Sequence, residues 1–283
     1  MKIDVLGAGV WARNLTGVSA LQALLTGTPA NPQIAFEAPR PEAIAARERR
    51  RAGLMINLAV TVAHEACERS ELPVAQPGSV FTSAMGDTAI TDYMCRKLAA
   101  PEKLLSPTKF HNSVHNAPSG YWTISAGNRA PSSFVGGFRE SFGAGLLEAA
   151  SQALAAQEPI LLVASDIACE TPFDSIEPVR ESLGLAIVLA PAGWRAQGPV
   201  LTRATLTFAA TERPDAQAPQ HPWLAALAEA NPSGAGLALL ERLYTQEQAP
   251  ADSTESVRTP QRAPLKIKAA PEAQLTVEFE AVP

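Results

Sequence analysis

Short segments made almost entirely of apolar residues alternate with helical patterns along the first 190 residues. The clearest pair is a helix predicted over residues 143–157, with Leu146, Leu147, Ala150 and Leu154 on one face, and a continuous apolar strand over residues 160–165. A strand that is apolar on both sides is typical of a sheet covered by helices on both faces. The pattern therefore predicts a layered α/β fold.

The same reading divides the chain into successive elements. We expect further strands at residues 2–6, 78–84, 133–137 and 185–190, and helices at residues 16–25, 42–66 and 87–98, the first capped by Thr16. After Pro191 the pattern gives a strand at 200–209 and short helices at 221–230 and 234–244. The expected parts are a main unit (1–190), a reduced C-terminal part (191–244), a linker (245–264) and C-terminal edge strands (265–283).

Composition excludes several classes of protein. A net charge of −5 argues against broad binding of nucleic acid, which needs an excess of basic residues on one face. The sequence has no apolar run of about 20 residues that could span a bilayer, and its N-terminus lacks a signal-peptide pattern, so we expect a cytoplasmic protein. The three cysteines, Cys67, Cys95 and Cys169, form no CxxC pair or disulfide framework.

No cofactor or metal is expected. His111 and His115 have i,i+4 spacing, but the zinc-binding helix motif also needs a glutamate between them. Gly7, Gly9 and Ala12 match the loose dinucleotide-binding fingerprint G-x-G-x-x-G/A after a strand. However, no helix begins directly after these residues, and Glu37 is the only acidic residue that could bind the ribose. A turn that needs small residues is the favoured interpretation, and a dinucleotide-binding oxidoreductase stays an alternative.

Two further segments carry charged or polar groups of interest. Arg47, Arg49, Arg50 and Arg51 form a basic run, which is either a solvated helix face or a docking patch for an acidic carrier protein. Residues 136–143 join a predicted strand to the helix predicted over residues 143–157 and include small residues. Such a strand-to-helix turn is where α/β enzymes hold a nucleophile. Ser141 is the hydroxyl there but lacks the GxSxG context, and Glu140 could cap the helix.

The order of these features resembles the N-terminal half of β-ketoacyl synthases, of the thiolase-like fold. The opening IDVLGAGVWARNLTGVSALQALLTG, the segment LSPTKFHNSVHNAPSGYWTISAGNRAPSSF and the run FGAGLLEAASQAL followed by PILLVASD correspond to ordered landmarks of that family over roughly residues 1–190. SPTKFHNSVHNAPSGYWTI and GAGLLEA look like a bacterial subgroup of ketosynthase-like chain-length-factor proteins associated with aryl-polyene-type lipid pathways. The resemblance implies a helix at residues 121–126, where propensity alone favours a strand.

Two departures from the family decide what the resemblance implies for activity. The position of the nucleophilic cysteine falls on Arg139, and an arginine cannot form an acyl thioester. The family's condensing enzymes also use two histidines from a C-terminal half, whereas His221 is the last histidine here. Since nucleophile and oxyanion partners act as a unit, we expect no catalytic residue and no condensation.

The resemblance also implies a partner. In the family two subunits pair through the segment around the nucleophile strand, and each contributes to the base of the other's acyl tunnel. It therefore implies a heterodimer of this chain with a complete β-ketoacyl synthase, served by an acyl carrier protein. Candidate tunnel residues are Ile90, Tyr93 and Met94, and candidate interface residues are Asn116, Tyr121, Trp122, Phe134 and Phe138. The main alternative is an enzyme with altered chemistry, a decarboxylase or acyltransferase that uses Glu140 or Ser141.

Overall fold

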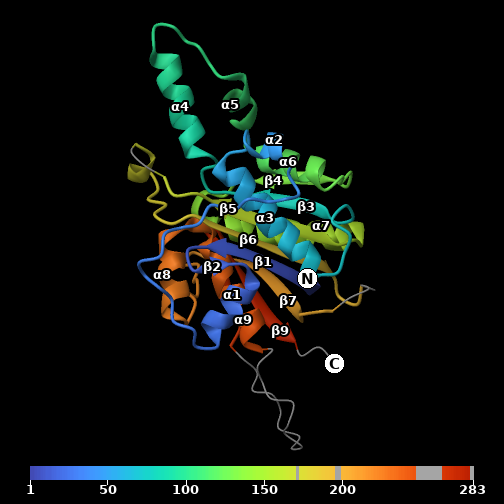
Figure 1. Ribbon diagram of the computed structural model, residues 1–283. Helices are drawn as coiled ribbons and strands as arrows, with labels where there is room; N and C mark the ends of the chain where they lie inside the picture. The colour runs from blue at the N-terminus through green and yellow to red at the C-terminus, as the bar shows by residue number, and fades with distance from the viewer. Residues whose placement is uncertain (170–171, 195–198, 247–262, 281–283) are drawn as a thin grey trace, which may run out of the picture.

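The long strand β1 (Lys2–Ala12) lies near the middle of a mixed sheet in the computed structural model of the protein, which describes residues 1–169, 172–194, 199–246 and 263–280 (Figure 1). Within these residues the sheet has nine strands in the order β4-β3-β5-β6-β1-β7-β9-β8, with β2 paired to β1. The other strands are β2 (Leu15–Thr16), β3 (Gly78–Thr82), β4 (Ser132–Val135), β5 (Ile160–Asp166), β6 (Leu183–Pro191), β7 (Thr202–Ala210), β8 (Leu265–Ala270) and β9 (Ala273–Glu280).

Strand direction separates the sheet into two parts. β4, β3 and β5 are parallel, whereas the pairs from β5 through β6, β1, β7 and β9 to β8 are antiparallel. Every residue of β5 and β6 is buried, as expected for strands covered on both faces. β4 and β8 are the two edge strands of the described sheet.

Helices cover both faces of the sheet, which confirms the layered α/β prediction. One core lies between the sheet and two helices, α3 (Leu54–Arg69) and α6 (Ala117–Ser125). The other core lies between the opposite face and α1 (Val18–Leu25), α7 (Ser141–Ala156), α8 (Pro222–Ala230) and α9 (Ala235–Gln246). Three single-turn 3₁₀ segments are η1 (Phe138–Glu140), η2 (Phe173–Ser175) and η3 (Pro232–Gly234).

Three helices lie away from these two layers. α4 (Thr88–Ala99) and α5 (Pro107–Asn112) project beyond the parallel end of the sheet, and the short α2 (Ala46–Arg49) lies beside α6 (Figure 1). Among the described residues, no helix is long and apolar enough to cross a membrane.

The structure differs from three of the expectations for individual elements and confirms a fourth. Thr16 does not cap the first helix, because it pairs with β1 in β2 and Gly17 (φ +113°) then turns the chain into α1. The helix expected at 42–66 is interrupted between α2 and α3. The alternating C-terminal segment is not the edge, because β9 pairs with both β7 and β8. The helix implied at residues 121–126 is present as part of α6.

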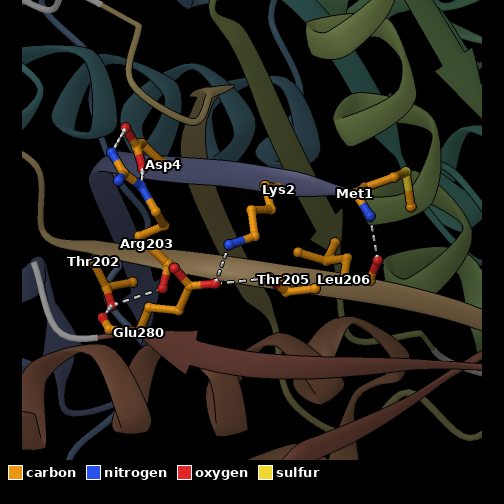
Figure 2. A network of polar contacts seen from close by, with 8 residues as sticks. All are labelled: Met1, Lys2, Asp4, Thr202, Arg203, Thr205, Leu206 and Glu280. Atoms are coloured by element: carbon orange, nitrogen blue, oxygen red, sulfur yellow. Dashed lines mark hydrogen bonds and ion pairs between the residues drawn. The ribbon is translucent and has the colours of Figure 1, made fainter.

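The C-terminal strands are bonded directly to the N-terminal strand of the same chain. The Arg203 guanidinium donates to both carboxylate oxygens of buried Asp4, at 2.6 and 3.0 Å, and the Met1 ammonium donates to the Leu206 carbonyl at 2.8 Å (Figure 2). Lys2 pairs with Glu280 at 3.0 Å, and hydrogen bonds from Lys2 and Thr205 lower the pKa of Glu280. β7 and β9 therefore extend the sheet of this subunit.

Candidate functional site

The strand-to-helix turn singled out in the sequence is a tight elbow, which we define as residues 136–141. β4 ends at Val135 and α7 begins at Ser141, with η1 between them. The Ser141 side chain is 0% exposed. Its hydroxyl accepts the Gly137 N–H at 3.0 Å and lies 2.7 Å from the Phe138 carbonyl and 3.0 Å from the Ser83 carbonyl. Ser141 therefore holds the elbow together from inside.

A buried carboxylate, Asp166, binds the segment that follows β3, which is in turn bonded to the elbow. Asp166, at the end of β5, accepts the Ser83 hydroxyl at 2.7 Å, the Ala84 N–H at 2.8 Å and the Ser233 hydroxyl at 2.6 Å. Burial raises the pKa of Asp166 above its ordinary value, against the opposing effect of these hydrogen bonds. The Asn231 side chain adds a bond to the Asp166 carbonyl at 3.0 Å. This network joins β3, β5 and η3 behind the elbow.

Arg139 stands on the outer side of the elbow. Its Nε donates to Glu177 Oε2 at 2.5 Å, and Glu177 is itself buried while the arginine side chain is largely exposed. Glu140 occupies the N-cap position of α7 but makes no capping hydrogen bond through its side chain, so the predicted capping role is wrong. The position where the family resemblance implies a cysteine therefore carries an ion-paired guanidinium.

A cleft of about 740 Å³ lies in front of the elbow. Its lining includes Arg139, Glu140 and Glu177 together with residues of α8, residues 216–219 and Lys268 of β8. The lining contains no histidine and no cysteine. His221 is occupied at the start of α8, where its Nδ1 accepts the Trp223 N–H at 3.2 Å. The described cleft offers charged groups and small apolar side chains, with no thiol or imidazole for acyl transfer.

The three residues predicted to line a tunnel lie on the projecting helix α4. Ile90 is buried, and Tyr93 and Met94 are half-buried. The Tyr93 hydroxyl accepts the Ser106 N–H at 3.0 Å, and Lys109 Nζ lies 4.0 Å from the centre of the tyrosine ring. Tyr93 thus ties α4 to α5 in the single chain, and the tunnel role of the three residues stays a prediction.

The five predicted interface residues fall into two groups. Asn116 and Phe138 are exposed, and Tyr121 and Phe134 are half-buried. Trp122 is different, because it is 0% exposed and packs in the core beneath α3 with its ring against His64. The prediction of Trp122 as a contact residue is therefore wrong.

The glycines of the fingerprint Gly7-x-Gly9 serve helix packing. Both lie inside β1 and not in a turn, since the strand continues to Ala12 through a register shift between Val5 and Gly7. A Cβ at Gly7 would lie 2.4 Å from the Ala66 carbonyl oxygen, and one at Gly9 would lie 2.3 Å from that of Val62. The two residues let α3 lie close to the strand, and the turn needed for a dinucleotide is absent from this described segment.

Among the described residues, no three His, Cys, Asp or Glu side chains gather closely enough to hold a metal ion. His111 and His115 point to different neighbours. His111 Nδ1 lies 3.0 Å from the Asn112 side-chain oxygen, whereas the His115 ring meets Phe134 edge-on at 5.4 Å.

An apolar groove of about 840 Å³ was not anticipated from the sequence. It lies among α2, α5 and α6 and includes the exposed side chains Phe110, Val114 and Ile124. The available signal was their apolar character within a mostly polar stretch. Glu177, Asp166 and Ser233 were also missed, because their partners are distant in sequence.

The layered sheet and the elbow define the class as a ketosynthase-like, thiolase-like α/β fold. Three solved structures share it over nearly the whole of both chains. A complex of a ketosynthase with its chain length factor from Xenorhabdus doucetiae has a TM-score of 0.67 at 19% identity, covering 98% of this chain and 99% of the other. A type II polyketide synthase acyl-carrier protein in complex with its ketosynthase has 0.70 at 12%, covering 99% of each. The ishigamide ketosynthase/chain length factor has 0.64 at 12%, covering 100% of each.

Family membership follows from the sequence match. The model of the β-ketoacyl synthase N-terminal domain matches residues 27–249, and the chain belongs to this family. No protein of curated function matches the sequence.

Proposed function

We propose that this chain is a non-catalytic subunit of the chain-length-factor type. It pairs with a complete β-ketoacyl synthase and shapes the acyl tunnel for a growing polyene, polyketide or fatty-acid-type chain. The observation that carries the proposal is the elbow, which keeps the strand, turn and helix of the family but presents Arg139 paired with Glu177. An ion-paired guanidinium in place of a thiol leaves the scaffold intact without a nucleophile.

The β4 edge supports pairing with another subunit. β4 pairs only with β3 among the described strands, so its other side presents backbone groups that a partner strand can bond. Phe134 on this strand is half-buried, and the strongly exposed Ile124 (84%) lies on α6, which packs beside β4. An unpaired edge beside exposed apolar side chains is suited to a specific protein contact.

The direct test is co-expression with a complete ketosynthase, with sedimentation velocity to determine the mass of the product. We expect a one-to-one heterodimer that forms with the wild-type chain and is weakened by Ile124→Ser. Phe208→Ser is the matched control, because Phe208 is also an exposed apolar residue but lies on β7. A wild-type chain that stays monomeric beside the ketosynthase would contradict the proposal.

The tunnel is tested through the product. Met94 is half-buried on α4, so its side chain can be changed with less disturbance of the core than that of buried Ile90. In the active heterodimer, Met94→Trp should shorten the longest acyl product and Met94→Ala should lengthen it, since bulk at the base of a tunnel limits its depth. Mass spectrometry of the released products measures the change, and identical product lengths would reject Met94 as a floor residue.

The basic run provides a candidate surface for the acyl carrier protein. Arg47 and Arg50 are exposed, whereas Arg49 donates to the Pro41 carbonyl and Arg51 pairs with Glu48. An exposed basic patch attracts an acidic carrier through salt-sensitive steering. The double variant Arg47→Glu/Arg50→Glu should slow reaction with the carrier at low salt and leave the heterodimer mass unchanged. Equal rates for variant and wild type would remove this surface from the proposal.

The alternative of altered chemistry has less support from the geometry. The Ser141 hydroxyl is fully buried and surrounded by hydrogen-bond partners, although Glu140 does line the cleft. We expect no turnover of malonyl- or acyl-carrier protein by the isolated chain. Turnover that disappears in Glu140→Ala would replace the proposed function with a decarboxylase or acyltransferase.

A further inference from the structure

The apolar groove among α2, α5 and α6 has the size and the lining of a small-molecule site. Its volume of about 840 Å³ lies within the range of ligand pockets in proteins. Exposed apolar side chains line it, among them Phe110, Val114 and Ile124. Apolar side chains that gather in a concave surface mark a binding site, and the tunnel candidates on α4 are not part of this lining.

His111 lines the groove, and the buried Asn112 fixes the orientation of its imidazole. Asn112 Nδ2 donates to the Arg51 carbonyl at 2.9 Å. Since a carbonyl can only accept, Asn112 Oδ1 is the atom that lies 3.0 Å from His111 Nδ1. An amide oxygen accepts, so Nδ1 carries the hydrogen and donates it. In the neutral imidazole this leaves Nε2 as a hydrogen-bond acceptor.

Tyr121 belongs to the same arrangement. Its hydroxyl donates to Asn112 Oδ1 at 3.4 Å, and its ring meets the His111 ring edge-on, with centres 6.3 Å apart. Two side chains that line the groove are thus bonded to one buried amide. None of the described residues forms a hydrogen bond with His111 Nε2, so this nitrogen is available to a ligand.

The charges around the groove favour an uncharged ligand. Glu48 is the one carboxylate among its described lining residues, and Arg51 pairs with it at 3.4 Å. Asn116 and Ser125 are neutral, and no described lysine or arginine lines the groove. An ionic group would lose water here without gaining a free opposite charge, whereas a hydroxyl loses little if it finds an acceptor.

We propose that this groove binds an uncharged, largely apolar molecule whose hydroxyl donates a hydrogen bond to His111 Nε2. A long-chain alcohol has this chemistry, since its alkyl chain covers apolar lining such as Ile44 and Val114 and its one donor meets the imidazole. Every group that the proposal uses lies in the single chain. The inference therefore stands apart from the proposed function and is tested on the isolated protein.

The test compares 1-decanol with decyl methyl ether, which has the same alkyl chain and no hydrogen to donate. Wild type should bind the alcohol about tenfold more tightly than the ether. His111→Phe keeps an aromatic ring but removes the acceptor, so it should bind both compounds with equal affinity. Val114→Asp and Ile124→Asp, at two exposed lining positions, should each weaken both compounds about tenfold. Phe208→Ser is the control, since Phe208 is exposed on β7.

Isothermal titration calorimetry measures the affinities, and urea denaturation checks that each variant is folded. Equal affinity of wild type for the alcohol and the ether overturns the role of His111. Undiminished binding to both aspartate variants means that the compounds bind elsewhere and overturns the groove as their site. A wild-type chain that binds neither compound overturns the whole inference and assigns the exposed groove to a protein contact, without touching the test of the heterodimer.

Discussion

Asp166 shows how one buried residue connects the segments that lie behind the elbow. It is buried, and its carboxylate receives donors from two serine hydroxyls and a backbone N–H that come from separate parts of the chain. Removing the acceptor would leave each of these donors buried without a partner. The contribution of Asp166 to stability should therefore be large for a single side chain.

Asp166→Ala should lower the free energy of unfolding by about 3 kcal/mol, because several buried donors lose their acceptor at once. Urea denaturation followed by tryptophan fluorescence measures the change. Asp92→Ala is the matched control, since Asp92 makes only a surface ion pair with Arg96 one helical turn away and should leave the midpoint unchanged. Equal effects of the two variants would refute the role assigned to the buried network.

The raised pKa of Asp166 also sets a pH dependence. A carboxyl whose folded pKa lies above its ordinary value of 3.8 contributes stability that is present below pH 3.8 and is lost as pH rises through the folded pKa. The stability of wild type relative to Asp166→Asn should therefore fall as pH rises from about 4. Unfolding free energies of both proteins at several pH values test this, and a constant or rising difference contradicts it.

The cysteines differ in accessibility. Burial, followed by the charge of Glu68, raises the pKa of the Cys67 thiol to about 12, whereas Cys95 is exposed on α4. At pH 8 a disulfide reagent should modify Cys95 rapidly in the native chain and reach Cys67 only after unfolding. Cys95→Ser should lower the number of thiols that react rapidly in the native chain by one, whereas Cys67→Ser should leave that number unchanged. Fast labelling that disappears in Cys67→Ser would contradict the buried placement.

At the scale of elements, the first turn of α7 depends on the C-terminal strand β8. A Cβ at Gly143 would lie 1.9 Å from the Lys268 carbonyl oxygen, so only glycine allows the helix behind the elbow to approach that backbone. α7 contacts β8 as well as β3, β5 and β6. The elbow and the C-terminal hairpin form one packing unit.

Gly143→Ala should destabilise the protein by about 2 kcal/mol or more, since backbone must move to admit the methyl group. Gly120→Ala in α6 is the control, because a Cβ there meets nothing within 4 Å and alanine favours a helix. Urea denaturation should show a lower midpoint for the first variant and an unchanged or higher one for the second. A tolerated Gly143→Ala would mean that β8 is not fixed against α7.

At the scale of the whole molecule, the first residues and the C-terminal strands stabilise each other. Asp4 is 1% exposed and accepts from Arg203 and, at 2.8 Å, from the Gly193 N–H (Figure 2 shows the Arg203 pair). Since residues 2–5 of β1 pair with β7, and β7 pairs with β9, loss of this contact should loosen the sheet beyond one strand.

Asp4→Ala should lower the free energy of unfolding by about 2 kcal/mol, because the Gly193 N–H loses its acceptor and the guanidinium loses its partner. Lys2→Met removes only the exposed pair with Glu280 and should leave the denaturation midpoint unchanged. Hydrogen exchange in β7 and β9 gives a second measurement, where faster exchange is expected in Asp4→Ala alone. Matching exchange rates in the two variants would contradict the link.

The layers could be predicted from the amino-acid sequence, because the apolar strand around Leu161–Val163 and the helix before it, with Leu146 and Ala150 on its buried face, leave few alternatives to a covered sheet. The sequence also located the elbow and the arginine at its tip, since these depend on chain order. Local pattern misled where tertiary contacts decide. Gly7 and Gly9 suggested a turn, yet they are strand residues whose missing side chains admit α3, and Trp122 suggested a contact but fills the core.

The polar contacts around the elbow could not be predicted from the sequence. The bonded pairs Arg139–Glu177, Ser83–Asp166 and Asp166–Ser233 are separated by 38, 83 and 67 residues. At such separations no local periodicity carries a signal. The left-handed backbone of Phe138 is likewise invisible in a sequence that offers two glycines just before it. Periodicity records which face of an element is buried, whereas the partner of a buried polar group is set by how distant segments pack.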